Sequence, residues 1–153
     1  MIGPGGARVV PADDWYRGYL QSALDEREIL RAIRWRPWPR GHGAGFHEYA
    51  RRHGDFAIAG AAALLDCAAD RTIRRAAIVV FGVEPAPRRL PRSEQALVGQ
   101  KLDDAALAAA AEEARGLDAM SDLHVSAEYR RHIAGVVTGR ALADAAQAAE
   151  VAA

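Results

Sequence analysis

Apolar and polar positions alternate most clearly in the middle of the chain, where the pattern predicts three β-strands. Residues 72–83 are the strongest case, with Arg74 on one face of the strand and apolar side chains on the other. Residues 46–52 form a shorter candidate. Residues 56–65 are rich in alanine and glycine, so their length and the preceding Gly-Asp turn, rather than periodicity, favour a strand. The apolar face of 72–83 is predicted to consist of Ile73, Ala77, Val79, Phe81 and Val83.

Tight turns and helix signals follow these strands. Residues 66–71 are interpreted as a hairpin loop, with Asp66 and Asp70 as turn residues. Residues 84–91 contain three prolines and are expected to form an extended connector. A short helix is then predicted from Ser93 to Gly99.

Two longer helices are predicted in the last third of the chain. Asp103 or Asp104 starts the first, which ends at Gly116. Ser126 caps the second, whose inner stripe should hold Tyr129, Ile133, Val136 and Val137. Strands in one run and helices in the next predict an α+β fold, with a three-stranded antiparallel sheet followed by a helical bundle.

The first 40 residues follow a different pattern. We expect a short strand at residues 8–10 and a brief helix over residues 15–20, with Asp13 as its cap. Residues 28–36 end in strand-like alternation. Residues 41–45 contain three glycines and are interpreted as a flexible loop, a hinge between two substructures. The apolar face of 28–36 would hold Ile33 and Trp35.

Composition describes an ordinary globular chain. It has 153 residues, of which 50% are hydrophobic and 26% charged, which is enough to bury a core. No apolar run approaches the roughly 18 residues that a membrane helix needs. The beginning of the chain lacks the charged and apolar regions of a signal peptide. With a single cysteine, Cys67, an internal disulfide is excluded, and we expect a cytoplasmic protein.

The net charge is zero, but the charges are unevenly spread. Residues 27–92 carry 13 arginines and 6 acids, for a net +7, whereas residues 93–153 have a net −5. This asymmetry predicts a basic face and an acidic face. Arginines alternate with aromatic residues only around Trp35 and Trp38, and no nucleic-acid-binding module is recognisable. Nucleic acid is therefore not an expected partner.

Several short patterns resemble catalytic or binding motifs but lack their essential spacing. His47 and His53 are six residues apart, so on a strand they would be separated by about 20 Å and are not expected to bind one metal ion. The glycines at 41–45 lack both the sixth-position glycine of a dinucleotide loop and the Walker lysine. No nucleophile-elbow motif is present, and Cys67 is interpreted as a space-filling residue.

The stretch from Arg51 to Ala57 is the most specific local pattern. Gly54 allows a positive φ at a tight turn. Asp55 could accept backbone N–H bonds at that turn or pair with Arg51 or Arg52. From these residues alone, a structural turn and a functional motif remain open.

Three stretches form longer motifs. ARRHGDFAIAGAAALL covers residues 50–65, GPGGARVVPADDWYRGYLQSALDEREILRAI covers residues 3–33, and SAEYRRHIAGVVTGRAL covers residues 126–142. In this order they resemble the FAD-carrying (medium) subunit of the molybdenum hydroxylases, the xanthine dehydrogenase, aldehyde oxidase and aerobic carbon-monoxide dehydrogenase type. The resemblance covers nearly the whole chain.

The resemblance implies a domain division and a set of partners. Residues 1–40 correspond to the end of the family's FAD-binding domain, and residues 41–153 to its C-terminal domain of three antiparallel strands plus helices. In the family, electrons pass from a molybdenum cofactor through iron–sulfur clusters to FAD, and from FAD to an acceptor. The expected partners are therefore an iron–sulfur subunit and a molybdenum-cofactor subunit.

The resemblance also assigns site residues, and one departure affects them. In relatives, a leucine of the EIL stretch and a lysine after a strand phenylalanine touch the flavin; here these positions are Leu30 and His47. The two glycine-rich loops that hold the FAD pyrophosphate have no counterpart in this chain. A separate N-terminal FAD-binding fragment could supply them. The signature residues Arg51, Arg52 and Asp55 are interpreted as structural.

Two functions follow from these observations. In the first, the chain is a truncated or partial FAD-binding subunit of a molybdenum hydroxylase, an oxidoreductase component that is inactive in isolation and relays electrons through FAD when assembled. In the second, the chain is a stand-alone protein-interaction module without redox activity, which docks through its basic and acidic halves.

Overall fold

The computed structural model describes residues 1–152, with side chains described as far as residue 149. The chain divides into two compact units, residues 1–37 and the part that begins at Trp38. Each unit is described by itself below.

The first unit consists of short antiparallel hairpins. Strands β1 (Ile2–Gly3) and β2 (Gly6–Ala7) form one hairpin, and β3 (Tyr16–Gly18) and β4 (Gln21–Ser22) form the second. A 3-10 turn, η1 (Ala12–Asp14), lies between them.

The sequence predictions for this unit are wrong in their secondary structure. Residues 8–10 are not a strand, and residues 15–20 form part of a hairpin in which Leu20 has a φ of 54°, instead of a helix capped by Asp13. In 28–36 only Ile29 pairs, with Ile2, because no second strand lies alongside the rest. The residues expected to share its apolar face, Ile33 and Trp35, are exposed.

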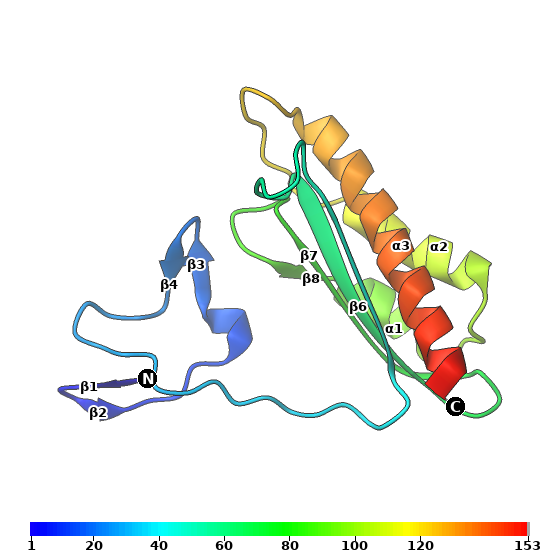
Figure 1. The fold of residues 1–153 in the computed structure, drawn as a ribbon, viewed down its shortest axis with the longest axis horizontal. Helices are drawn as coiled ribbons and strands as arrows, with labels where there is room; N and C mark the ends of the chain where they lie inside the picture. The colour runs from blue at the N-terminus through cyan, green and yellow to red at the C-terminus, as the bar shows by residue number, and fades with distance from the viewer. Residues whose placement is uncertain (153) are drawn as a thin grey trace. The chain divides into compact units, whose positions relative to one another are not determined.

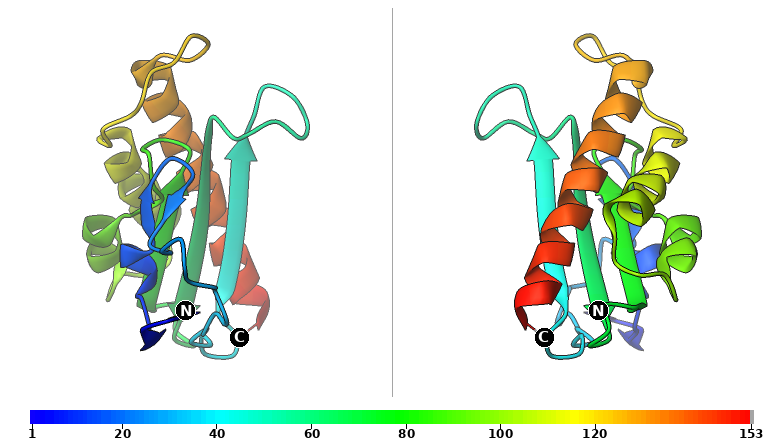
Figure 2. Two further views of the ribbon diagram at one scale, coloured as in Figure 1. Left: turned by 90° about the vertical axis from the view of Figure 1, so that its left-hand side faces the viewer. Right: turned by 90° about the vertical axis from the view of Figure 1, so that its right-hand side faces the viewer.

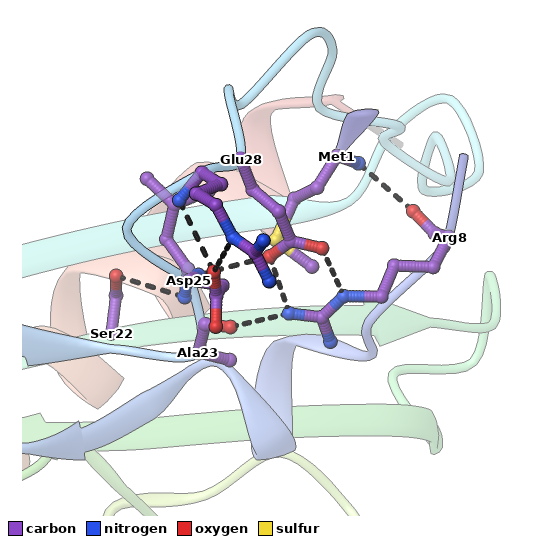
Figure 3. A network of polar contacts seen from close by, with 8 residues as sticks. Met1, Arg8, Ser22, Ala23, Asp25 and Glu28 are labelled. Atoms are coloured by element: carbon purple, nitrogen blue, oxygen red, sulfur yellow. Dashed lines mark hydrogen bonds and ion pairs between the residues drawn. The ribbon is translucent and has the colours of Figure 1, made fainter. Parts of the chain in front are cut away.

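A polar network joins the segment after the first hairpin to the segment after the second (Figure 3). The Arg8 guanidinium donates to both carboxylate oxygens of Glu28, at 2.6 Å each, and also to the Ala23 carbonyl. The Asp25 amide donates to the same carboxylate of Glu28. These bonds, with that from Arg8 first, lower the pKa of Glu28 to about 2.

The second unit is a four-stranded antiparallel sheet with three helices on one face (Figures 1 and 2). The strands lie in the order β5 (Gly43–Tyr49), β6 (Ala59–Cys67), β7 (Ile73–Phe81) and β8 (Arg88–Arg89). The α+β prediction of three antiparallel strands followed by helices is confirmed. The sequence missed only β8, a two-residue strand within the predicted connector. The helices are α1 (Pro91–Leu97), α2 (Asp104–Arg115) and α3 (Ala127–Ala152).

Side-chain caps begin the two long helices as predicted. Asp103 accepts a hydrogen bond from the Ala106 amide at 2.8 Å, and Ser126 accepts one from the Tyr129 amide at 3.2 Å. The start of α1 was predicted wrongly. Pro91 opens it in a first-turn position, where a missing N–H costs nothing. Ser93 lies inside this helix, buried, and donates to the Ala110 carbonyl.

The β6–β7 hairpin is tighter than predicted. Asp70 is a turn residue, since it accepts from the Thr72 amide at 3.1 Å. Asp66 instead lies in β6, buried, with its carboxylate 2.7 Å from the Arg74 guanidinium. The strand continues to Cys67, where the register shifts.

The predicted apolar face of β7 is wrong in the central part of the strand. Ile73 and Val83 are buried as predicted. Between them, Ala76, Ile78 and Val80 are buried, whereas the predicted Ala77, Val79 and Phe81 are half-buried. Apolar residues occupy both sets of alternate positions in this strand, so alternation could not identify the face that the helices cover.

Of the residues predicted as a flexible glycine loop, 43–45 form the start of β5, and Gly41, with a φ of 84°, lies in the turn before it. A Cβ atom built on Gly43 would overlap the Ala145 carbonyl, and one built on Gly45 would overlap the Ala141 carbonyl. The backbone of α3 therefore lies directly against this strand. Glycine is needed here for close approach, not for flexibility or phosphate binding.

Small residues also form the inner face of α3. Tyr129, predicted to begin the inner stripe, is 43% exposed, and Ile133 and Val136 are only half-buried. Of the predicted stripe, Val137 alone is fully buried. The buried residues of this inner face include Ala134, Val137, Thr138, Ala141, Leu142, Ala145 and Ala146.

Many arginines pair with acidic residues, so charge is locally compensated in the second unit. Arg89 pairs with Glu94 at 2.6 Å, and Arg92 pairs with Glu113 at 3.1 Å. Glu113 also accepts a hydrogen bond from Ser93. Desolvation is the largest single influence on the Glu113 carboxyl and raises its pKa, but the hydrogen bonds from Ser93 and Arg92 together outweigh it, so the pKa is lowered. The basic and acidic segments of the sequence are thus partly joined to each other.

We expect Glu28 to titrate with a midpoint near pH 2 in a ¹³C NMR titration of the side-chain carboxyls. Because its pKa is lowered in the folded unit, its stabilising effect is complete above its ordinary pKa and is lost as the pH falls toward 2. Arg8→Gln should return the midpoint to the ordinary range. An unchanged midpoint in that variant would contradict the role of Arg8.

Gly45→Ala should destabilise the second unit by about 2–3 kcal/mol, since the methyl group must displace the backbone of α3. Urea unfolding followed by circular dichroism would measure the change. The control is Ala44→Val, at the neighbouring exposed position of the same strand, for which we expect a change within about 0.5 kcal/mol. Equal effects of the two variants would show that α3 does not require the close approach.

Candidate functional site

Leu30 lies in the first unit, in the segment that follows the β3–β4 hairpin. Its side chain is 41% exposed. The neighbouring Ile29 exchanges two backbone hydrogen bonds with Ile2, at 3.0 and 2.9 Å, and this pairing positions the segment. Leu30 is thus a partly exposed apolar side chain on a backbone that is held in place.

His47 lies in the second unit, on β5, opposite Ala61 of β6. Its imidazole Nε2 is 2.8 Å from the Asp144 carboxylate Oδ2 on α3. The side chain is about one-third exposed, at 34%. Within the described residues the other ring nitrogen, Nδ1, has no hydrogen-bond partner.

The chain from residue 50 to residue 57 is an exposed loop between β5 and β6. Gly54 has a φ of +87°, which confirms the predicted turn. The Asp55 amide donates to the Arg52 carbonyl at 3.1 Å, whereas the Asp55 carboxylate contacts neither arginine in the described structure, contrary to one sequence expectation. Arg51, Arg52 and His53 are exposed.

A buried arginine anchors the end of this loop. Arg130, 6% exposed on α3, donates to the carbonyls of Ile58 and Gly82 at 2.7 and 2.8 Å. It also donates to the Met120 carbonyl and to the Asp122 carboxylate. Hydrogen bonds from the backbone amides of His124 and Val125, and then the positive charge of Arg130, lower the pKa of the Asp122 carboxyl. They outweigh desolvation, which would raise it. One guanidinium therefore joins three loops to the helix.

Sequence reasoning missed both Asp144 and Arg130. Arg130 is four residues before Ala134, on the inner face of α3, so a charged residue within an apolar stripe was an available signal. Asp144 offered no signal, because it is an exposed acid 97 residues from its partner.

The face of the sheet opposite the helices carries aromatic side chains. Phe46 stacks on Phe81 with a ring separation of 5.7 Å, and Phe46 is 58% exposed. A side chain on Gly60 would overlap the Phe81 ring, so glycine makes room for the pair. On β7 of the same sheet, the guanidinium carbon of Arg75 lies 4.1 Å from the centre of the Trp38 ring.

The described residues contain no cluster of three His, Cys, Asp or Glu side chains that could hold a metal ion. The described surface includes a groove of about 360 Å³ and another of about 400 Å³. The first lies along the β1–β2 hairpin and the second between α1 and α2. Neither is lined by Leu30 or His47.

Comparison with known proteins identifies the family. Residues 44–145 match the carbon-monoxide dehydrogenase flavoprotein C-terminal domain. The chain belongs to this family. The resemblance inferred from the sequence motifs is confirmed.

Individual relatives cover almost the whole chain. The carbon monoxide dehydrogenase medium chain of Afipia carboxidovorans is 37% identical over 93% of this chain and 49% of its own length. The caffeine dehydrogenase subunit beta of Pseudomonas sp. strain CBB1 is 39% identical over 92% of this chain and 48% of its own. The chain therefore spans about half the length of the curated relatives that it matches.

Solved structures agree with the family assignment. A Cu,Mo-carbon monoxide dehydrogenase chain has a TM-score of 0.88 at 36% identity, covering 96% of this chain and 51% of its own. Quinoline 2-oxidoreductase from Pseudomonas putida 86 has a TM-score of 0.80 at 30% identity, covering 97% of this chain and 51% of its own. This chain is thus similar to flavoprotein oxidoreductase subunits of the carbon monoxide and xanthine dehydrogenase family. None of its described helices has the length and apolar character required to cross a membrane.

Arg130→Met should destabilise the second unit by about 3 kcal/mol, because buried carbonyls lose their donor. Hydrogen exchange should become faster at the start of β6, where Arg130 bonds to Ile58. Arg131→Met is the control, since Arg131 is half-buried beside it on the same helix and a change below about 1 kcal/mol is expected. Equal exchange rates in both variants would contradict the anchoring role.

Proposed function

We propose that this chain is the C-terminal part of the FAD-carrying subunit of a molybdenum hydroxylase. In the assembled enzyme it helps to hold FAD, which receives electrons from iron–sulfur clusters and passes them to an acceptor. The family match over residues 44–145 carries this proposal. Relatives named as medium chains or FAD-binding subunits, at 30–37% identity, support it.

The described residues fit one part of FAD and not another. Leu30 offers a partly exposed apolar side chain. His47 offers an imidazole whose Nδ1 has no hydrogen-bond partner among the described residues. Both side chains suit contacts to a flavin ring. Among the described residues, no glycine-rich loop opens a long helix, which is the arrangement that usually holds a pyrophosphate. Gly43 and Gly45 are covered by α3 instead.

A second polypeptide segment is therefore required to hold the pyrophosphate. We assign residues 1–40 to the end of an FAD-binding domain and residues 41–153 to the C-terminal domain of the subunit. The division of the chain after Pro37 lies near this boundary. The half-exposed sheet face with Phe46 and Phe81 supports burial against a further part of the enzyme.

The remaining partners are an iron–sulfur subunit and a subunit with the molybdenum cofactor. Both redox groups belong to the partners, because the described residues of this chain offer no metal cluster and the chain has one cysteine. The assembled enzyme is proposed to be cytoplasmic. The chain alone is proposed to be inactive.

The alternative function is a protein-interaction module without redox chemistry. The lack of a pyrophosphate-binding loop favours it. The two functions differ in one property, which is whether Leu30 and His47 contribute to FAD binding once the missing segment is supplied.

Flavin fluorescence would test the proposal. FAD titrated into the purified chain should show no tight binding. A hybrid in which the unmatched half of the Afipia carboxidovorans medium chain precedes this chain should retain FAD. In the hybrid, Leu30→Ala and His47→Ala should each weaken FAD binding about fivefold to tenfold, the effect of losing roughly 1 kcal/mol of contact.

Leu123→Ala and His53→Ala are matched controls, because Leu123 is 99% exposed and His53 lies in the exposed loop. Both should bind FAD as the parent hybrid does. A hybrid that folds and retains FAD equally well in all four variants would favour the interaction module.

A further inference from the structure

The contact between His47 and Asp144 joins β5 to α3 where the two elements are already fixed. Gly43 and Gly45 bring the strand against the backbone of α3 at Ala145 and Ala141, on either side of residue 144. Both side chains of the polar pair are partly exposed, at 34% for His47 and 54% for Asp144. The pair is therefore not needed to hold the helix against the strand. Its main effect is to orient the imidazole ring of His47.

The chemistry of the two groups decides which ring nitrogen carries hydrogen. A carboxylate only accepts hydrogen bonds, so Nε2 of His47 is the donor in the 2.8 Å contact with Asp144. In the neutral ring, Nδ1 then carries a lone pair and is an acceptor. Nδ1 has no partner among the described residues, so it is the atom available to a ligand.

We propose that Asp144 is a positioning residue that holds the His47 ring with Nδ1 presented to the flavin. This rests on the proposed function, in which His47 contacts FAD. The neutral ring accepts a hydrogen bond from an N–H donor, such as the imide of a flavin. When Nδ1 takes up a proton from solvent, the ring becomes a cation that donates to a carbonyl or an anionic group.

Of the described charged and titratable groups around His47, Asp144 is the one that forms a hydrogen bond with its ring. On α3, Arg140 precedes Asp144 by one turn and is exposed. On β5, Tyr49 lies two residues from His47 on the same side of the strand, and Glu48 faces the other side. The residue opposite on β6 is Ala61, which carries no charge.

The first experiment uses the chain alone and reads the ring directly. ¹⁵N NMR of labelled histidine, at a pH where the ring is neutral, should show His47 as a single Nε2–H tautomer. Asp144→Ala should produce a mixture of the two tautomers, and Asp144→Asn should not restore the single form, because an amide can donate as well as accept a hydrogen bond. The same spectrum in the parent chain and in Asp144→Ala would overturn the proposal.

The second experiment tests whether Asp144 acts through His47. In the FAD-retaining hybrid, Asp144→Ala should weaken FAD binding about threefold to fivefold, but less than twofold when His47→Ala is already present. Glu128→Ala, an exposed acid on the same helix, is the control and should leave binding unchanged. Equal losses in the two backgrounds would indicate a structural role for Asp144 and overturn the proposal.

The two experiments separate this inference from the proposed function. If Asp144→Ala changes the tautomer but His47→Ala leaves FAD binding unchanged, the flavin contact at His47 is wrong, and the ligand assignment fails with it. If His47→Ala weakens FAD binding but the tautomer does not depend on Asp144, the proposed function stands and the positioning role is wrong.

Discussion

The second unit depends on the close approach of a long helix to an edge strand. Gly43 and Gly45 remove the side chains that would separate β5 from α3, and alanines at 141 and 145 do the same from the helix. Backbone-to-backbone packing of this kind gives each residue little apolar area to bury but many short contacts. It also brings Asp144 within hydrogen-bond distance of His47.

Polar contacts add stabilisation that the small residues, with little apolar area to bury, do not supply. Arg130 satisfies carbonyl groups at the ends of three loops, and buried Asp66 pairs with Arg74 on the neighbouring strand. In the first unit, which has few buried apolar residues, the Arg8–Glu28 pair has a comparable role. Several arginines of this chain are thus used for local pairing with acidic residues.

This chain spans about half the length of a carbon monoxide dehydrogenase medium chain. Under the proposed function, Leu30 and His47 contact the flavin ring, and the partly exposed Phe46–Phe81 face packs against a further part of the enzyme. A histidine at this position adds a group that either accepts or donates, depending on its protonation.

Sequence alone determined the fold class, the order of the three long strands and three helices of the second unit, the helix caps at Asp103 and Ser126, and the family. These follow from local rules, such as periodicity and capping, or from long motifs. It could not determine which face of β7 is buried, because both faces are apolar, nor that Gly43 and Gly45 belong to a strand. It also could not find Asp144 as the partner of His47. Those features depend on where α3 lies against the sheet, and only the packing of distant segments decides that position.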